Sequence, residues 1–177
     1  QINYFGAIRL TMALLPSMSK RKKGQVINIS SISVQGPSPR FAAYVASKSA
    51  LDAWTRSAAV EYSDRNLRFT TIYMPLVRTP MIAATDIYNS IPVLSSDEAG
   101  DLLVEAVIDK PKRIASNMGI FLQLMTAAAP KFTEVLMNIV FRMFGDSAAA
   151  QGGKKGETIE VSNEQAALAA LMKGVHF

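Results

Sequence analysis

The sequence predicts an α/β fold built on a parallel β-sheet. Apolar helical stripes over residues 2–18 and 42–62 alternate with short strands at 25–29 and 68–73. This alternation is typical of parallel sheets, because their neighbouring strands are joined by helical crossovers. Two strands are too few for a doubly wound sheet. We therefore expect this chain to be the C-terminal part of such a sheet, with its other strands upstream of Gln1.

Each of these four elements has its own signal. Residues 2–18 carry apolar side chains at spacings of three and four, and Pro16 is expected to bend the last turn. Residues 25–29 form a β-branched run typical of a buried strand. Residues 42–62 are rich in alanine and have one apolar side, and residues 68–73 form the second strand, which a Met-Pro pair ends.

The later part of the chain predicts helices and links. Ser95 is expected to cap a helix, with Glu98 as its partner in a capping box, and this helix ends before Pro111. The apolar stretch over residues 119–144 is expected to form two helical pieces separated at Pro130.

Composition excludes several classes of function. The 177 residues are 49% hydrophobic and 19% charged, which suits a globular domain with a core. There is no cysteine, so disulfides and thiol catalysis are excluded, and we expect a reducing, cytoplasmic location. The single histidine, His176, is no basis for a histidine triad, and no metal site is expected. No apolar run is long enough to predict a membrane span, and no signal-peptide pattern is present.

The formal net charge is +5, and residues 20–23, all basic, supply part of it. Such a run can contact phosphate groups or an anionic membrane, although most basic runs are solvated loops. No aromatic residues interleave with this run, so no nucleic-acid partner is expected.

Three polar residues carry the predicted chemistry: Ser31, Tyr44 and Lys48. Tyr44 and Lys48 are four residues apart on a predicted helix, so both side chains emerge on one face. A phenol has a pKa of about 10, and a nearby ammonium group lowers it, which suits a tyrosine that exchanges a proton with a carbonyl or alcohol oxygen. Ser31 follows a strand at the edge where ligands collect, and its hydroxyl can polarise the same oxygen.

These residues stand in a longer pattern. Asn28-Ile29-Ser30-Ser31 and a Gly36-Pro37-Ser38-Pro39 loop precede Tyr44-Val45-Ala46-Ser47-Lys48, and the serine lies 13 residues before the tyrosine. The pattern resembles the short-chain dehydrogenase/reductase family. The resemblance implies a Rossmann-like fold, NAD or NADP as cofactor, and hydride transfer between this cofactor and a small carbonyl or alcohol substrate.

The resemblance extends to both sides of the motif. Residues 1–6 are similar to the helix that carries the family's catalytic asparagine, which implies a proton relay through Asn3. Residues 74–80 are similar to a Pro-Gly-x-x-x-Thr segment that contacts the nicotinamide. The implied catalytic set is Asn3, Ser31, Tyr44 and Lys48. The implied cofactor contacts are Tyr44, Lys48, Pro75, Val77 and Thr79.

Each of these residues also has a purely structural interpretation. Ser31 could be a turn residue at a strand end, and Lys48 could pair with Asp52 on its own helix. Asn3 could be a helix N-cap, and Thr79 could cap the turn before Pro80.

The sequence departs from the family pattern in two places. It has no glycine-rich phosphate-binding turn, so most of the cofactor site is expected upstream of Gln1, and the choice between NAD and NADP stays open. Leu76 replaces the usual glycine after Pro75. The chain in isolation is therefore expected to be inactive. The alternative function is a non-catalytic or truncated module derived from such an enzyme.

The chain divides into three predicted parts. Residues 1–116 form the catalytic half of a nicotinamide-binding domain, residues 117–145 an apolar helical extension, and residues 146–177 a flexible link and a short helix, 163–173. The extension either packs against the core or a second subunit, or covers a lipid-like substrate, and its surface is compatible with peripheral membrane contact.

Two further expectations concern substrate and assembly. Residues 74–81 together with the extension are similar to the reductase domain of bacterial fatty acyl-CoA reductases, which implies a long-chain aldehyde or an acyl-derived ketone as substrate. The resemblance also implies a homo-oligomer in which the helices at 2–18 and 42–62 form the shared face. Ala50, Trp54 and Ala58 are expected to lie exposed on it.

Overall fold

The structure is a computed structural model, and it describes residues 1–79 and 93–143. Its centre is a parallel three-stranded sheet in the order β1 (Gly24–Ser31), β2 (Leu67–Met74) and β3 (Arg113–Ala115). The predicted α/β fold with a parallel sheet is therefore confirmed, and β3 is a strand that the sequence pattern did not reveal. Three residues are too few to show the two-residue period of a strand.

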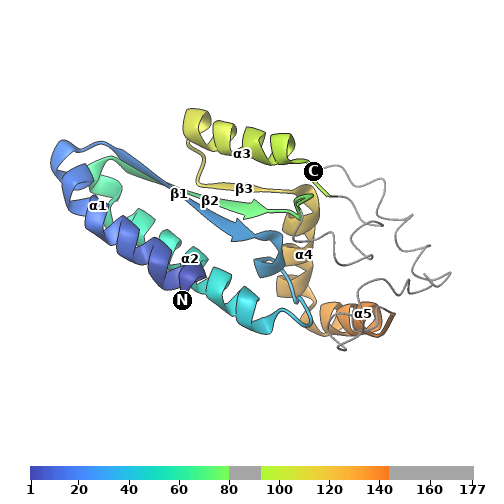
Figure 1. The fold of residues 1–177 in the computed structure, drawn as a ribbon. Helices are drawn as coiled ribbons and strands as arrows, with labels where there is room; N and C mark the ends of the chain where they lie inside the picture. Colours follow the sequence, from blue (N-terminus) through green and yellow to red (C-terminus); the bar gives the residue numbers. More distant parts are fainter. Residues whose placement is uncertain (80–92, 144–177) are drawn as a thin grey trace.

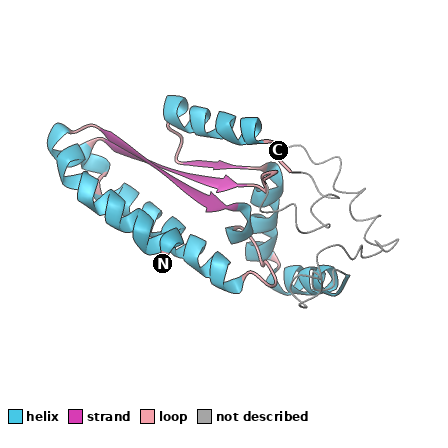
Figure 2. Ribbon diagram, viewed as in Figure 1, coloured by secondary structure: helices cyan, strands magenta, loops and turns pink. Residues whose placement is uncertain are grey.

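Helices cover both faces of the sheet, and two more stand at one end (Figures 1 and 2). α1 (Ala7–Arg21) and α2 (Ala42–Glu61) pack on one face, and α3 (Ser96–Asp109) packs on the other. α4 (Asn117–Ala128) and α5 (Pro130–Met143) lie beyond the carboxyl ends of the strands. None of the helices in residues 1–79 and 93–143 is long and apolar enough to cross a bilayer.

β2 is the buried centre of the sheet, and its alternate residues serve two cores. Leu67 and Phe69 pack with Leu15 of α1 and Ala58 of α2. On the opposite face, Ile72, which is fully buried, packs with residues of α3 and β3. β2 is buried along most of its length, and its buried residues include two β-branched threonines, Thr70 and Thr71, beside the apolar ones.

The helix signals in the sequence are largely reproduced. The capping box of Ser95 and Glu98 is present at the start of α3. Pro130 is the first residue of α5, where its missing N–H costs nothing, so it separates α4 from α5 as predicted. Pro16 lies inside α1, which continues to Arg21.

Two expectations need correction or lie out of reach. Ala58 is only 3% exposed, and Trp54 packs against the same core cluster, so these two residues do not form a free subunit face. The predicted link and helix after residue 146 lie outside the described residues. Pro80 and Met81 lie outside them as well. α4 and α5 fall in the range of the predicted extension, and the division into three parts remains a prediction.

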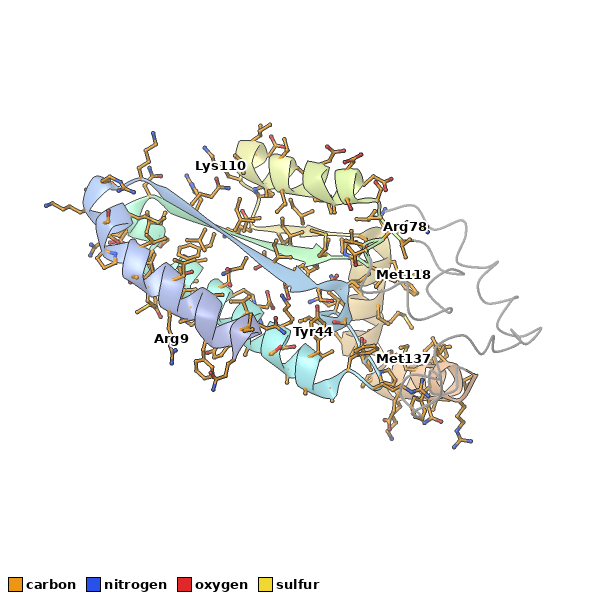
Figure 3. The ribbon with its side chains drawn as sticks, in the orientation of Figure 1. Arg9, Tyr44, Arg78, Lys110, Met118 and Met137 are labelled. Carbon is orange, nitrogen blue, oxygen red and sulfur yellow. The ribbon has the colours of Figure 1, made fainter. Side chains whose placement is uncertain are left out.

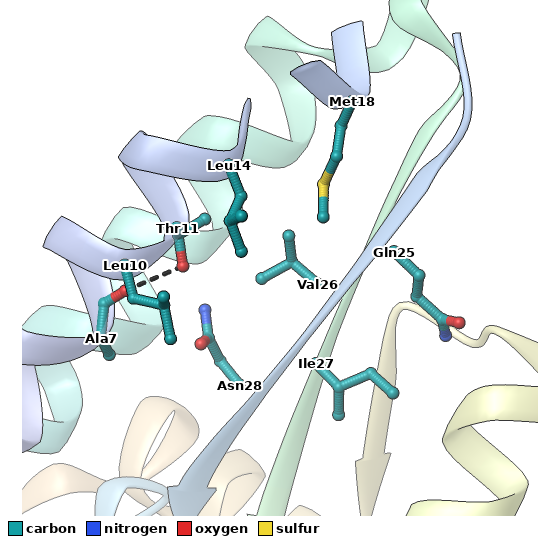
Figure 4. A pocket seen from close by; sticks show the side chains of 9 residues that line it. All are labelled: Ala7, Leu10, Thr11, Leu14, Met18, Gln25, Val26, Ile27 and Asn28. Carbon is teal, nitrogen blue, oxygen red and sulfur yellow. Dashed lines mark hydrogen bonds between the residues drawn. The ribbon is translucent and has the colours of Figure 1, made fainter. Parts of the chain in front are cut away.

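β1 is one of the two edge strands of the described sheet, and a cavity of about 200 Å³ lies between it and α1. Figure 4 shows its lining, in which Leu10, Leu14 and Met18 of α1 face Val26 and Asn28 of β1.

Candidate active site

Ser31 is the last residue of β1 and caps a short 3₁₀ turn, Ile32–Val34. Its Oγ accepts two hydrogen bonds from Ser33, one from the N–H at 3.2 Å and one from the hydroxyl at 2.8 Å. Its side chain is almost fully buried. Because both lone pairs of Oγ are engaged, its own proton remains available for a ligand oxygen. Ser31 is thus a turn residue at the strand end, and its catalytic role stays a prediction.

Tyr44 and Lys48 lie on the first two turns of α2. Tyr44 is 39% exposed at the carboxyl end of the sheet (Figure 3), which leaves its phenol accessible to a substrate. The Nζ of Lys48 donates a hydrogen bond to the carbonyl oxygen of Ile29 at 2.9 Å, which ties α2 to β1 two residues before Ser31. Burial lowers the pKa of Lys48.

The alternative pairing of Lys48 with Asp52 is not what the structure shows. Asp52 is buried and accepts a hydrogen bond from the Tyr73 hydroxyl at 2.8 Å. It also pairs with the Nε of Arg56 at 3.3 Å. Its partners are thus a β2 tyrosine and the arginine one turn further along α2, while the ammonium group of Lys48 is directed at β1.

Asn3 lies in a π-helical turn, Ile2–Gly6, that precedes α1, and Gln1 rather than Asn3 is its N-cap. The Nδ2 of Asn3 donates to the Oγ of Ser47 at 3.4 Å, and Ser47 in turn donates to the carbonyl oxygen of Tyr44 at 2.7 Å. Single π-helical turns occur often at functional sites. This contact places Asn3 beside the helical turn that carries Tyr44 and Lys48.

Pro75, Val77 and Thr79 follow the end of β2. Val77 forms an isolated parallel bridge with Leu94, and its two bonds use the carbonyl of Leu76 and the N–H of Arg78. In a parallel bridge the central residue's own N–H and C=O point away from the partner strand, so those of Val77 face the side opposite Leu94. Thr79 is half-buried, and its hydroxyl has no hydrogen-bond partner within residues 1–79 and 93–143.

Parallel pairing brings these segments to one edge of the sheet. Ser31 lies opposite Met74 in the register of β1 and β2, so the turn after Ser31 and the segment after Met74 start side by side. The carboxyl edge of a parallel sheet is where ligands bind in open α/β folds. Within the described residues, no group of three histidine, cysteine or acidic side chains could hold a metal ion.

The sequence did not reveal the residues that pack behind the loop of Ser31, namely Gln35, Gly36 and Gly119. Gln35 is 2% exposed, and among residues 1–79 and 93–143 neither its amide nitrogen nor its amide oxygen has a hydrogen-bond partner. Gly119 of α4 packs directly against this amide, and Gly36 packs directly under Leu122 of α4. A Cβ at either glycine would clash, so the two glycines allow α4 to approach the loop of Ser31. The glycines themselves were the available signal, but their partners lie far apart in sequence.

A second cavity, of about 450 Å³, lies between the loop that joins Ser31 to Tyr44 and α5. Pro37 and Pro39 form one side, and the side chains of α5 form the other, chiefly Val135, Met137, Ile139 and Phe141. The guanidinium group of Arg40 stacks over the ring of Phe141 at 4.4 Å from its centroid, which fixes α5 to this loop. The lining is mainly apolar.

The parallel sheet with helices on both faces is a Rossmann-like α/β fold, and the predicted polar residues follow the carboxyl ends of its strands. Comparison with known proteins specifies the family: residues 1–87 match the family described as short chain dehydrogenase, and over these residues the chain belongs to that family. The predicted resemblance is thereby confirmed.

Several curated relatives match the whole chain. A fatty acyl-CoA reductase of Acinetobacter baylyi is 50% identical over 177 residues, which are 100% of this chain and 59% of that protein. An uncharacterized oxidoreductase of Mycobacterium tuberculosis is 39% identical over 178 residues, which are 100% of this chain and 52% of that protein. The chain thus spans between about half and three fifths of these relatives.

A solved structure shows the same fold. The short chain dehydrogenase of Burkholderia cenocepacia in complex with NADP superimposes with a TM-score of 0.66 at 22% identity, and the match covers 77% of this chain and 56% of that one. At this identity the likeness concerns the fold.

Proposed function

We propose that the full-length protein that contains this chain reduces a carbonyl group with NAD(P)H, and that its substrate is a long-chain, acyl-derived aldehyde or ketone. One observation carries the proposal. Ser31 at the end of β1 is held by two hydrogen bonds from Ser33, Lys48 donates to the carbonyl oxygen of Ile29 on the same strand, and Tyr44 is exposed one helical turn before Lys48.

The residues present fit a nicotinamide cofactor. The backbone N–H and C=O of Val77 face away from their strand bridge, which suits a planar carboxamide that both donates and accepts hydrogen bonds. Thr79 would contact the same carboxamide through its hydroxyl, Pro75 would pack beside the ring, and Lys48 and Tyr44 would contact the ribose. The cofactor, when bound, supplies the hydride. NAD and NADP remain equal candidates.

The chain's own residues then handle the oxygen of the substrate. The hydroxyl of Ser31 donates a hydrogen bond to this oxygen, because the lone pairs of Ser31 Oγ already accept hydrogen bonds from Ser33. The phenol of Tyr44 gives its proton to the same oxygen as the carbonyl becomes an alcohol. The ammonium group of Lys48, one helical turn away, stabilises the phenolate that remains, and Asn3 holds the far side of this turn through Ser47.

Two observations support a long apolar substrate. The cavity beside α5 opens along the loop between Ser31 and Tyr44, and its walls are mainly apolar. The relative from Acinetobacter baylyi is named as a fatty acyl-CoA reductase. We infer that the acyl chain occupies this cavity, with α4 and α5 as its cover. The lack of cysteine agrees with a cytoplasmic location.

The proposal is tested with Tyr44→Phe in the full-length protein, which removes the proton donor and keeps the ring. We expect a loss of turnover of about 100-fold or more, the usual scale of a general acid. Tyr62→Phe, at the other end of α2, is the matched control and is expected to leave turnover unchanged. Near-normal turnover of Tyr44→Phe with an aldehyde substrate, or equal loss in both variants, would exclude the assignment.

The substrate class is tested by a series of aldehydes of increasing chain length. We expect kcat/KM to rise with chain length, and Ile139→Trp, which narrows the cavity beside α5, to abolish this preference while keeping turnover of short aldehydes. The isolated 177-residue chain is expected to be inactive, because its sequence contains no glycine-rich phosphate-binding turn. Equal rates for short and long chains would remove the acyl substrate from the proposal.

A further inference from the structure

The end of the sheet opposite the candidate active site is strongly basic. At this amino edge, three connections enter the three strands: α1 to β1, α2 to β2, and α3 to β3. The first carries residues 20–23, all basic, the second Arg65 and Arg68, and the third Lys110 and Lys112. All eight side chains are exposed. We call this set the amino-edge patch.

The fold, rather than the sequence, gathers these cations. Gly24 and Leu67 lie opposite each other at the start of β1 and β2, so the first two connections begin at one level. The Nδ2 of Asn66 donates to the carbonyl oxygen of Lys22 at 3.1 Å and joins them directly. The third connection enters β3 from the same end, as the position of Lys110 in Figure 3 shows.

The charge at this edge is unbalanced. The three connections, residues 20–23, 61–68 and 109–112, contain eight basic side chains and three acidic ones, so they contribute as much formal charge as the whole chain, +5. Within the described residues, the patch has one ion pair, between Arg65 and its sequence neighbour Asp64 at 3.2 Å. Such an exposed pair neutralises little of the local potential.

Helix stability does not account for the patch. The cations in the last turn of α1 stabilise that helix through its dipole. Arg68, however, lies in a strand, and Lys112 lies two residues beyond the C-cap of α3. Lys22 and Lys110 have φ of 50° and 53°, in the left-handed region that favours glycine. Lysine at both positions adds charge where glycine would suit the backbone better.

We propose that the amino-edge patch docks on an anionic phospholipid surface. The cations are spread over three neighbouring connections, an arrangement that suits an extended anionic surface. In residues 20–23, 61–68 and 109–112 the aromatic side chains are limited to Tyr62, which is half-buried against Phe69, so the stacking contacts typical of single-stranded nucleic acid are missing. Docking at this edge leaves Tyr44, at the opposite end of the sheet, open to solvent (Figure 3). The inference does not depend on the proposed reaction.

The test is co-sedimentation of the full-length protein with vesicles of phosphatidylcholine alone or mixed with phosphatidylglycerol. A patch variant, Lys20→Gln with Lys23→Gln and Arg68→Gln, removes three positive charges from the edge. The control variant, Arg9→Gln with Lys131→Gln and Arg142→Gln, removes three exposed charges elsewhere. Circular dichroism of both variants is the control that checks whether the fold is kept.

We expect binding to the anionic vesicles to exceed binding to phosphatidylcholine by at least about tenfold. Each basic residue near a membrane contributes about fivefold, so the patch variant is expected to bind about 100-fold more weakly and the control variant to bind normally. Binding should also weaken with salt, since the Debye length shrinks from about 10 Å at 0.1 M to about 3 Å at 1 M. The inference is overturned by equal binding to both vesicles, by equal loss in both variants, or by tight binding to single-stranded DNA without vesicle binding.

Discussion

At the scale of single residues, the most informative contact is the pair of hydrogen bonds from Ser33 to Ser31. Ser33 donates its N–H and its hydroxyl to the same oxygen, and its own carbonyl accepts a hydrogen bond from Ser38 at 3.2 Å. Ser31 is therefore held in one orientation before any substrate arrives. Preorganised donors of this kind cost no rearrangement during the reaction, so Ser33 acts as a positioning residue for Ser31.

Ser33→Ala removes one of the two hydrogen bonds and keeps the backbone N–H. We expect kcat in the full-length protein to fall about tenfold, the scale of one neutral hydrogen bond, with little change in KM. Ser33→Thr, which restores a hydroxyl, is expected to recover most of the loss. Ser57→Ala on the exposed side of α2 is the control. A purely structural role would move KM and stability together and would not be rescued by threonine.

Tyr73 and Asp52 predict how stability depends on pH. Burial, followed by the hydrogen bond to Asp52, raises the pKa of Tyr73 to about 12 from an ordinary value of 10.0. A raised pKa means that the neutral phenol stabilises the fold fully below pH 10 and that this contribution is lost as the pH rises from 10 to 12.

The variant Tyr73→Phe tests this contribution. It is expected to destabilise the protein by about 1–3 kcal/mol near neutral pH, because the buried Asp52 loses a donor. The difference from the unmodified protein should shrink between pH 10 and 12, as measured by urea unfolding across this range. A difference that stays constant up to pH 12 would contradict the role of the neutral phenol.

At the scale of elements, α4 supports the loop that carries Ser31. The contact depends on two glycines: Gly119 lies against the buried amide of Gln35, and Gly36 lies under Leu122. The 3₁₀ turn after Ser31 leads directly into Gln35, so a displacement of this side chain is transmitted to the turn. We therefore expect substitutions at this contact to affect the candidate active site.

Gly119→Ala places a methyl group where the amide oxygen of Gln35 lies. We expect kcat/KM in the full-length protein to fall by about tenfold or more, because the buried amide has little room to retreat. Gly100→Ala on α3 is the control, since open space surrounds that position and alanine favours helices. The double variant Gly119→Ala with Gln35→Ala removes the clash and is expected to recover activity. A double variant as poor as Gly119→Ala would show that Gln35 is not the point of contact.

At the scale of the whole molecule, α1 and the π-helical turn before it expose apolar side chains that suit a subunit interface. Phe5, in the π-helical turn, is 52% exposed, Met12, in α1, is 51% exposed, and Ile2, at the start of the turn, is 87% exposed. Apolar surface of this kind is typical of an interface between copies of one chain. The interface that we now expect centres on α1 and the turn before it, instead of on the buried Ala58 and the partly buried Trp54.

We predict that the full-length protein is a homo-oligomer. Light scattering at micromolar concentration is expected to give at least twice the monomer mass, and Phe5→Asp with Met12→Asp is expected to reduce it to that of the monomer. Val104→Asp with Ile108→Asp, exposed apolar positions on α3, is the control and should leave the mass unchanged. A monomeric unmodified protein would contradict the prediction.

The sequence by itself determined the features that depend on neighbours along the chain. The spacing of Ser31, Tyr44 and Lys48, the capping box of Ser95 and the two long strands all follow from local patterns, because caps, helical periods and β-branched runs involve residues only a few positions apart. The family and the parallel α/β fold could therefore be predicted.

Only the tertiary structure decided which distant segments meet. In the folded chain, Lys48 bonds to the carbonyl oxygen of Ile29 instead of pairing with Asp52. Ala58 is buried, and Gly119 lies against Gln35. The same holds for β3, whose three residues form a strand because β2 offers them a pairing edge, and for the cations gathered at the amino edge. Such contacts depend on how helices and strands pack, and packing energies between remote residues leave no periodic pattern in the chain.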